Sequence, residues 1–187
     1  MKKSLAVACS IILAAAVAGA FDIPGAGGGG KVDTKKFDEL ILSMDEVSAT
    51  VDEAENKIDG SNATLAAIAE AHGIADVMAD PAKITELKDA VTGDDKAKLQ
   101  AQVDIIKTVP GDLSTVTEDA AEIMVKIPDV LADLASQISA NPLSAKDLMD
   151  KQTQLQEGQT ALTELIENVP ALMDSAVNLT ATLMSLL

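Results

Sequence analysis

Residues 37–71 read FDELILS MDEVSAT VDEAENK IDGSNAT LAAIAEA, and this stretch decides the fold. Divided into sevens, it has an apolar residue at every first position and at every fourth position except Ser61. Acidic pairs fill most second and third positions, which lie opposite the apolar ones on a helix. The repeat therefore predicts a long helix with a continuous apolar seam. We define this seam as a candidate interaction surface consisting of Phe37, Leu40, Met44, Val47, Val51, Ile58, Leu65 and Ile68.

The ends and the middle of this helix are marked by particular residues. Asp33 or Thr34 is a suitable N-cap, and the pattern predicts a helix over residues 34–72. Gly60 lies inside it, and a glycine in a helix interior costs about 1 kcal/mol relative to alanine. Because the apolar register continues in phase beyond Gly60, we expect one continuous helix. A hinge at residues 59–62 is the alternative.

Further helices follow Gly73, and proline or glycine separates most of them. Asp80 precedes Pro81 and is the expected cap of the next helix, because proline is tolerated at a first helical position. We expect one helix to stop at residues 110–111, and a kink or restart at Pro128. The apolar periodicity predicts helices over residues 81–92, 94–109, 112–127, 129–140 and 144–187.

The last predicted helix carries a second heptad pattern. Every seventh residue from Leu148 to Leu183 is apolar, but Lys151 and Gly158 interrupt the first fourth positions of the pattern. Pro170 lies within this helix, where we expect a kink or a break.

The fold class expected from these patterns is all-α, an elongated helical bundle with coiled-coil-like long helices in a single domain over residues 33–187. The two heptad-bearing segments could pack together within one chain or pair between chains, and heptad spacing does not distinguish these arrangements.

The N-terminal residues predict export. Lys2 and Lys3 precede an apolar run that ends in an A-x-A motif, which is typical of a signal peptide over residues 1–20. A Gly-rich leader, expected to be disordered, follows over residues 21–32. An uncleaved membrane anchor and lipidation at Cys9 are the alternatives. Cleavage after residue 20 would leave no cysteine and no transmembrane span in the mature chain.

Composition excludes several classes of partner. The formal net charge is −16, and the chain contains no arginine, which argues against binding of nucleic acid. There is no tryptophan or tyrosine either, so aromatic platforms for sugars or peptides are not expected. A core built from Leu, Ile, Val, Met and Ala suits packing of helix on helix.

No group of residues in the sequence predicts a catalytic, metal or cofactor site. His72 is the only histidine, and one histidine cannot supply a usual zinc site. The carboxylates occur mainly as adjacent pairs on expected solvent faces or near helix starts. We therefore predict no catalytic residue, no metal site and no cofactor, and we expect that the protein is not an enzyme.

The hypothesis that follows is an exported protein, periplasmic or extracellular, that acts as a structural or interaction module. Its partner would be another protein or a second copy, bound through helix–helix contacts. The alternative is a carrier of an apolar ligand, such as a lipid, held between amphipathic helices.

Overall fold

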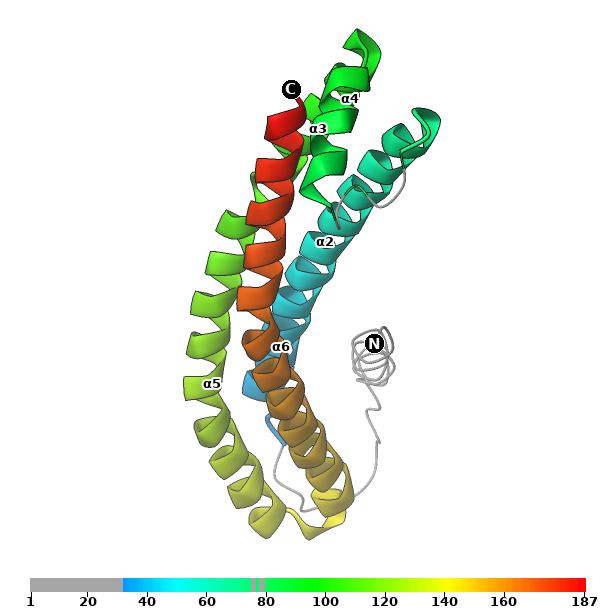
Figure 1. Ribbon diagram of the computed structural model, residues 1–187. Coiled ribbons are helices and arrows are strands. Elements are labelled where there is room, and N and C mark those ends of the chain that lie inside the picture. The colour runs from blue at the N-terminus through cyan, green and yellow to red at the C-terminus, as the bar shows by residue number, and fades with distance from the viewer. Residues whose placement is uncertain (1–31, 75–76, 78–79) are drawn as a thin grey trace. The chain divides into compact units, whose positions relative to one another are not determined.

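The computed structural model describes residues 32–74, 77 and 80–187 (Figure 1). The predicted signal peptide and all but the last residue of the predicted leader lie outside these residues. Every regular element in the described part of the chain is a helix, and long helices pack together, which confirms the all-α prediction. The elements are α2 (Lys35–Ala71), α3 (Pro81–Ala90), α4 (Gly93–Ile106), α5 (Val109–Ala140), the 3-10 turn η1 (Pro142–Ser144) and α6 (Ala145–Leu186).

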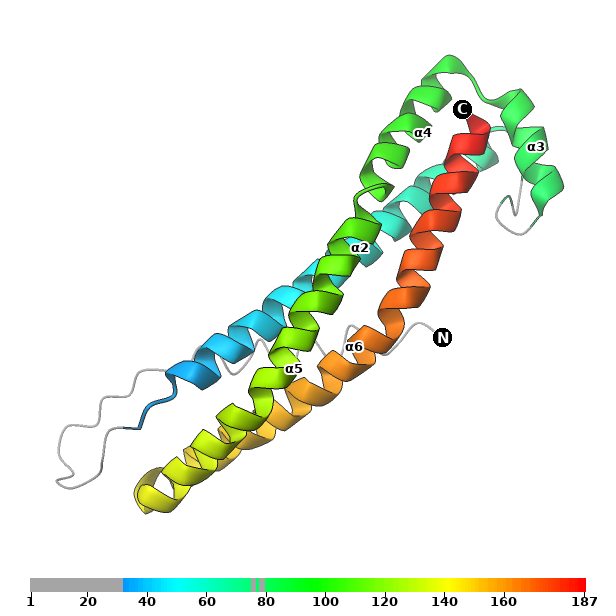
Figure 2. The same ribbon diagram turned by 90° about the vertical axis from the view of Figure 1, so that its left-hand side faces the viewer.

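The helices divide between two compact units. Of the described residues, unit 1 contains 32–49 together with Glu118–Glu167, so it holds the start of α2, most of α5 and the first half of α6. Unit 2 contains Thr50–Thr117 and Asn168–Leu187, which adds α3 and α4 to the remaining parts of α2, α5 and α6. In unit 1, α5 and α6 form an antiparallel pair joined by η1 (Figures 1 and 2).

Each unit has its own core of aliphatic side chains. Unit 1 buries Phe37, Leu40, Met44 and Val47 from α2, Ile123, Ile127, Val130 and Leu134 from α5, and Leu148, Leu155, Leu162 and Leu165 from α6. Unit 2 buries a comparable set, which includes Val51, Ile58, Leu65, Leu87, Leu99, Val103, Ile106, Leu113, Leu179 and Leu183. These side chains recur at intervals of three and four residues, so each helix buries one face.

Helix α2 continues through Gly60, as its unbroken register predicts, and the alternative hinge is not formed. A Cβ at Gly60 would have no atom within 4 Å, so no close contact requires glycine there. Gly73 does have a conformational role, because its φ of +71° is left-handed. Its N–H donates to the Glu70 carbonyl, and the Ile74 N–H donates to the Ala69 carbonyl, which satisfies the last carbonyls of the helix.

The shorter helices begin at capping residues. The Asp80 carboxylate accepts a hydrogen bond from the Ala82 N–H at 2.9 Å, as predicted from the Asp-Pro pair. Gly93 begins α4 rather than separating two helices, because Thr92 and Asp95 form a reciprocal capping box around that start.

Pro110, Pro128 and Pro170 lie within long helices and do not divide them, and a kink at Pro128 or Pro170 stays a prediction. The predicted break between two helices is present, but its position at residues 110–111 is wrong. Helix α4 ends at Ile106 and α5 begins at Val109, so Pro110 lies in the first turn of α5, where its missing N–H is harmless. Helix α5 does not restart at Pro128, and α6 does not break at Pro170. Both of these prolines are exposed, so water can reach the helix surface where each one removes a hydrogen bond.

Candidate interaction surface

The eight seam residues are buried by the chain itself. None has an exposed fraction above 6%. Phe37, Leu40, Met44 and Val47 belong to the core of unit 1, and the other four belong to the core of unit 2. The seam therefore packs within the chain, and contact of the same residues with a second chain stays a prediction that would require the helices to separate.

Lys151 interrupts the heptads of α6, and its side chain contacts two residues of α2. Its ammonium lies 4.2 Å from the centroid of the Phe37 ring. The same Nζ atom lies 3.2 Å from Oδ1 of Asp38. The half-buried lysine thus covers the edge of the unit 1 core while its charge is matched by a carboxylate and a ring face.

Gly158, the second interruption, allows α2 and α6 to approach closely. The glycine is buried, and a Cβ added there would lie 2.9 Å from Sδ of Met44. Met44 is itself only 2% exposed, so its side chain occupies the space that a larger residue at position 158 would need. The interruption is therefore a packing feature of unit 1.

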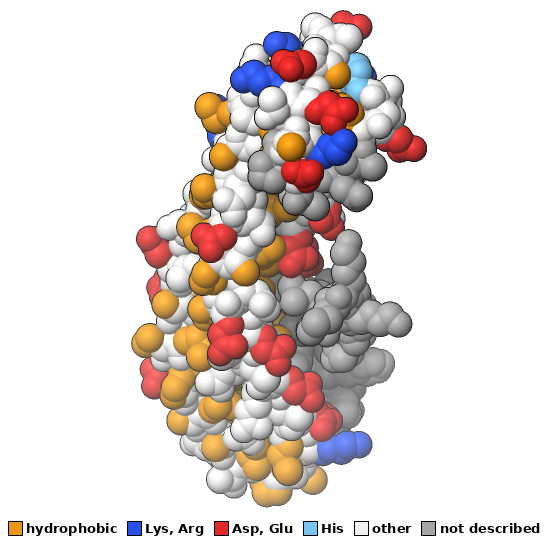
Figure 3. All heavy atoms as spheres, viewed as in Figure 1, with side chains coloured by type: hydrophobic (Ala, Val, Ile, Leu, Met, Phe, Trp, Pro, Cys, Tyr) orange, Lys and Arg blue, Asp and Glu red, His pale blue; other side chains and the backbone are white. Residues whose placement is uncertain are grey.

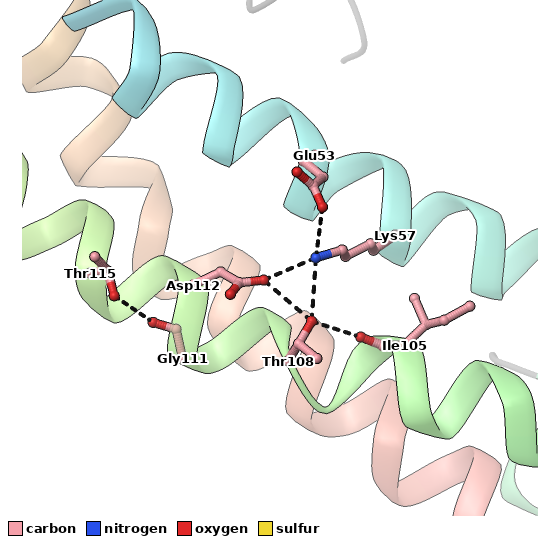
Figure 4. Close-up of polar contacts among 7 residues, drawn as sticks. All are labelled: Glu53, Lys57, Ile105, Thr108, Gly111, Asp112 and Thr115. Carbon is pink, nitrogen blue, oxygen red and sulfur yellow. Dashed lines mark hydrogen bonds and ion pairs between the residues drawn. The ribbon is translucent and has the colours of Figure 1, made fainter. Parts of the chain in front are cut away.

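In unit 2, Lys57 connects α2 with the start of α5 (Figure 4). Its Nζ lies 2.9 Å from the Glu53 carboxylate and 3.0 Å from the Asp112 carboxylate, and it also donates to the Thr108 hydroxyl. Hydrogen bonds to Glu53 and Asp112 raise the pKa of Lys57. We interpret these four side chains as a structural contact between helices, because the lysine ammonium bonds to the two carboxylates and the hydroxyl around it.

Two further polar contacts hold α2 against α4 in unit 2. Ser61 is fully buried, and its hydroxyl donates to Oε1 of Gln102 at 2.8 Å. Nε2 of His72 lies 2.9 Å from Oδ2 of Asp95. Hydrogen bonds from the Thr92 backbone N–H, from His72 and from the Thr92 hydroxyl hold the pKa of Asp95 well below its usual range. His72 therefore contacts a carboxylate that already caps α4.

Large apolar side chains remain exposed on both units. They are Leu42, Val125, Leu143 and Met149 in unit 1, and Ile105, Val177 and Met184 in unit 2. Leu143 is 88% exposed and Val125 is 77% exposed, the highest values among them. Isolated exposed residues of this kind are common on proteins, so the arrangement of their neighbours decides whether they indicate a surface.

The neighbours of Val125 continue its apolar character along α5. We define the α5 stripe as Ala121, Val125, Pro128, Ala132 and Ala135, all of which are exposed. Their spacing of four, three, four and three residues places them on one face of the helix. Figure 3 shows apolar side chains gathered along this helix. The stripe was not predicted from the sequence, although its spacing is visible there as a second apolar phase beside the buried one.

The first half of α6 carries a parallel row without charge, consisting of Met149, Thr153, Gln156, Thr160 and Thr163. All five are exposed and have the same spacing as the stripe. Thr153, Thr160 and Thr163 each donate their hydroxyl hydrogen to the carbonyl four residues earlier. Because these donors are used within the helix, the row offers fewer donors to water than its composition suggests.

A surface hollow of about 480 Å³ lies at the start of α2 and is lined by Val32, Asp33, Thr34, Lys35, Asp38, Glu39 and Leu42. Beside it, the Gln137 carboxamide accepts from the Asp33 N–H and donates to the Asp33 carbonyl. The hollow is open, and five of its seven lining residues are polar or charged, unlike the enclosed apolar pocket of a typical ligand site.

Residues 32–74, 77 and 80–187 contain no cluster of three or more potential metal ligands. In that same part of the chain, no helix combines the length and apolarity needed to cross a membrane. Comparison of the chain with protein-family models, with curated proteins and with solved structures found no match.

Proposed function

We propose that the protein is an exported, non-enzymatic helical module, periplasmic or extracellular, that binds a protein partner through helix–helix contacts. The observation that carries this proposal is the α5 stripe, where five exposed residues continue at helical spacing and Val125 is 77% exposed. A solvent-facing helix of a monomer usually carries polar residues on this face. An apolar row there is typical of a face that another helix covers.

The stripe is a better candidate than the seam because it is accessible. Val47 and Val51 are 3% and 0% exposed, so a charge placed at either position would disrupt the core of its own unit. Loss of assembly in such a variant would not identify an interface. Val125 can be changed without this difficulty, since its side chain already faces water.

Site-specific photo-crosslinking in the native host tests the proposal. A benzophenone side chain would replace Val125 in one variant and Leu42 in another, because Leu42 is an exposed apolar residue on a different helix of unit 1. We expect a discrete protein adduct from position 125 and a much weaker one from position 42. Absence of a discrete adduct at position 125 would contradict the proposed function.

Native mass spectrometry of the protein purified from the envelope fraction is the complementary measurement. A complex with a second polypeptide, or with a second copy, agrees with the proposal. A monomer that carries a lipid-sized adduct would contradict it and favour the alternative, a carrier of an apolar ligand between the helices.

A further inference from the structure

The two borders of the α5 stripe differ, and this difference bears on what the stripe can bind. The residues that follow four of its members are all charged: Glu122, Lys126, Asp129 and Asp133. The residues that precede its members are all apolar: Ala120, Met124, Ile127, Leu131 and Leu134. Successive residues are 100° apart on a helix, so one border of the stripe is charged and the opposite border is apolar.

The charged border is strongly acidic. Glu118 extends it by one turn, and all of its charged residues except Lys126 are acids. Nζ of Lys126 lies 3.1 Å from Oε1 of Glu122, so the one cation on this border is already paired with an acid of the same helix. A partner helix on the stripe would therefore meet a negative border formed by Glu118, Asp129 and Asp133. Asp133 accepts a hydrogen bond from the Gln137 carboxamide, and none of the three forms a salt bridge with a lysine of the described residues.

A second copy of the chain fits this border poorly. In an antiparallel pair of identical helices, equivalent flanking positions meet each other, which would place the acidic border opposite itself. In a parallel pair the acidic border would face the apolar border, which offers no cation either. The chain has 14 lysines against 30 acids and no arginine, so it has little positive charge to offer this surface.

We propose that the α5 stripe binds an amphipathic helix of another protein, with apolar residues at its centre and lysine or arginine along one border. This inference rests on the proposed function, and it specifies the chemistry of the partner. The apolar centre covers Val125, Pro128 and the alanines, whose small side chains allow close approach of the two helices. The basic border lies along Glu118, Asp129 and Asp133.

Binding of model peptides to the whole protein tests the inference. The probe is a fluorescein-labelled helix of roughly three heptads with leucine at a and d and lysine at e and g. Its counterpart has glutamate in place of lysine. We expect saturable binding of the lysine peptide and at least tenfold weaker binding of the glutamate peptide. The binding of the lysine peptide should also weaken as salt is raised from about 0.05 M to about 0.5 M.

Matched variants separate the stripe from general attraction to an acidic protein. Val125→Asp and Leu42→Asp add the same charge at exposed apolar positions of one unit, and we expect about tenfold weaker binding for the first alone. The pair Glu118→Gln and Asp129→Asn removes two charges beside the stripe. Asp150→Asn with Glu157→Gln removes two exposed charges from α6 and is its control. The first pair should weaken binding severalfold more than the second.

Several outcomes would overturn the inference. They are equal weakening by the two aspartate variants, equal affinity for the two peptides, or sedimentation of the protein as a dimer that Val125→Asp dissociates. None of these outcomes decides the proposed function, which photo-crosslinking tests separately. A photo-adduct at position 125 does not depend on the charge of the partner. A native partner trapped there without a basic amphipathic helix would overturn the inference alone.

Discussion

Replacement of Gly158 by alanine should destabilise the protein, although alanine is the better helix former. In an open helix the change gains about 1 kcal/mol. At position 158 the new Cβ would lie 2.9 Å from Sδ of Met44, and Met44 is 2% exposed. The methionine must therefore shift inside a packed core, for which overpacking typically costs about 1–3 kcal/mol. We expect a net loss of about 1 kcal/mol, which corresponds to about 2–4 °C in Tm for a chain of this size.

Two comparisons isolate the contact with Met44. Gly60→Ala places a Cβ in α2 with no atom within 4 Å, so it should gain about 1 kcal/mol. Met44→Ala removes the opposing side chain at a cost of about 2–5 kcal/mol. In that background Gly158→Ala should become stabilising by about 1 kcal/mol, so the double-mutant cycle should give a coupling energy of about 2 kcal/mol.

Chemical denaturation followed by far-UV circular dichroism measures these changes. The reasoning is refuted if Gly158→Ala stabilises the wild-type protein as much as Gly60→Ala does, or if the change at position 158 has the same effect with and without Met44. Either result would mean that α2 and α6 do not approach closely at this glycine.

Three further changes test polar contacts. The folded-state pKa of Asp95 is depressed, so the stability that its hydrogen bonds contribute is present above its unfolded pKa and is lost as the pH falls below about 4. Thermal melts of Asp95→Asn should therefore depend less on pH in this range than melts of the wild type, and an identical dependence would contradict the assignment. Ser61→Ala should cost about 1 kcal/mol by urea unfolding, because it removes the bond to Gln102; no measurable loss would argue against that bond. Lys151→Met should lose about 0.5–1 kcal/mol by the same assay, and an equal loss for the exposed control Lys146→Met would contradict a specific role for Lys151.

The helical class and the buried face of α2 could be predicted because they follow from periodicity alone. Val51 and Leu65 lie in phase on either side of Gly60. The free-energy cost of one glycine in the helix is smaller than the stabilisation from burying the apolar face of α2. A restart at Pro128 and a break at Pro170 were each predicted as alternatives to a kink. Neither occurs, because a lost hydrogen bond matters less on a solvent-facing side. Pro128 and Pro170 are both exposed.

Features that depend on a partner helix could not be predicted in this way. Lys151 and Gly158 look like errors in a heptad pattern until Phe37 and Met44 are placed opposite them. The same limit applies to α5, which has two apolar phases. Only packing determines that the phase of Ile123 and Ile127 is buried while that of Val125 faces water.

The sharing of three long helices between the two units has a consequence for synthesis. Unit 1 needs residues up to Glu167, and unit 2 needs residues up to Leu187, so neither can close before the ribosome has reached residue 167. Domains normally fold as they emerge, but this order of segments delays both units until their parts of α6 have been made. A shortened transcript that ends after residue 167 would still encode every segment of unit 1, whereas unit 2 would lack Leu179 and Leu183 from its core.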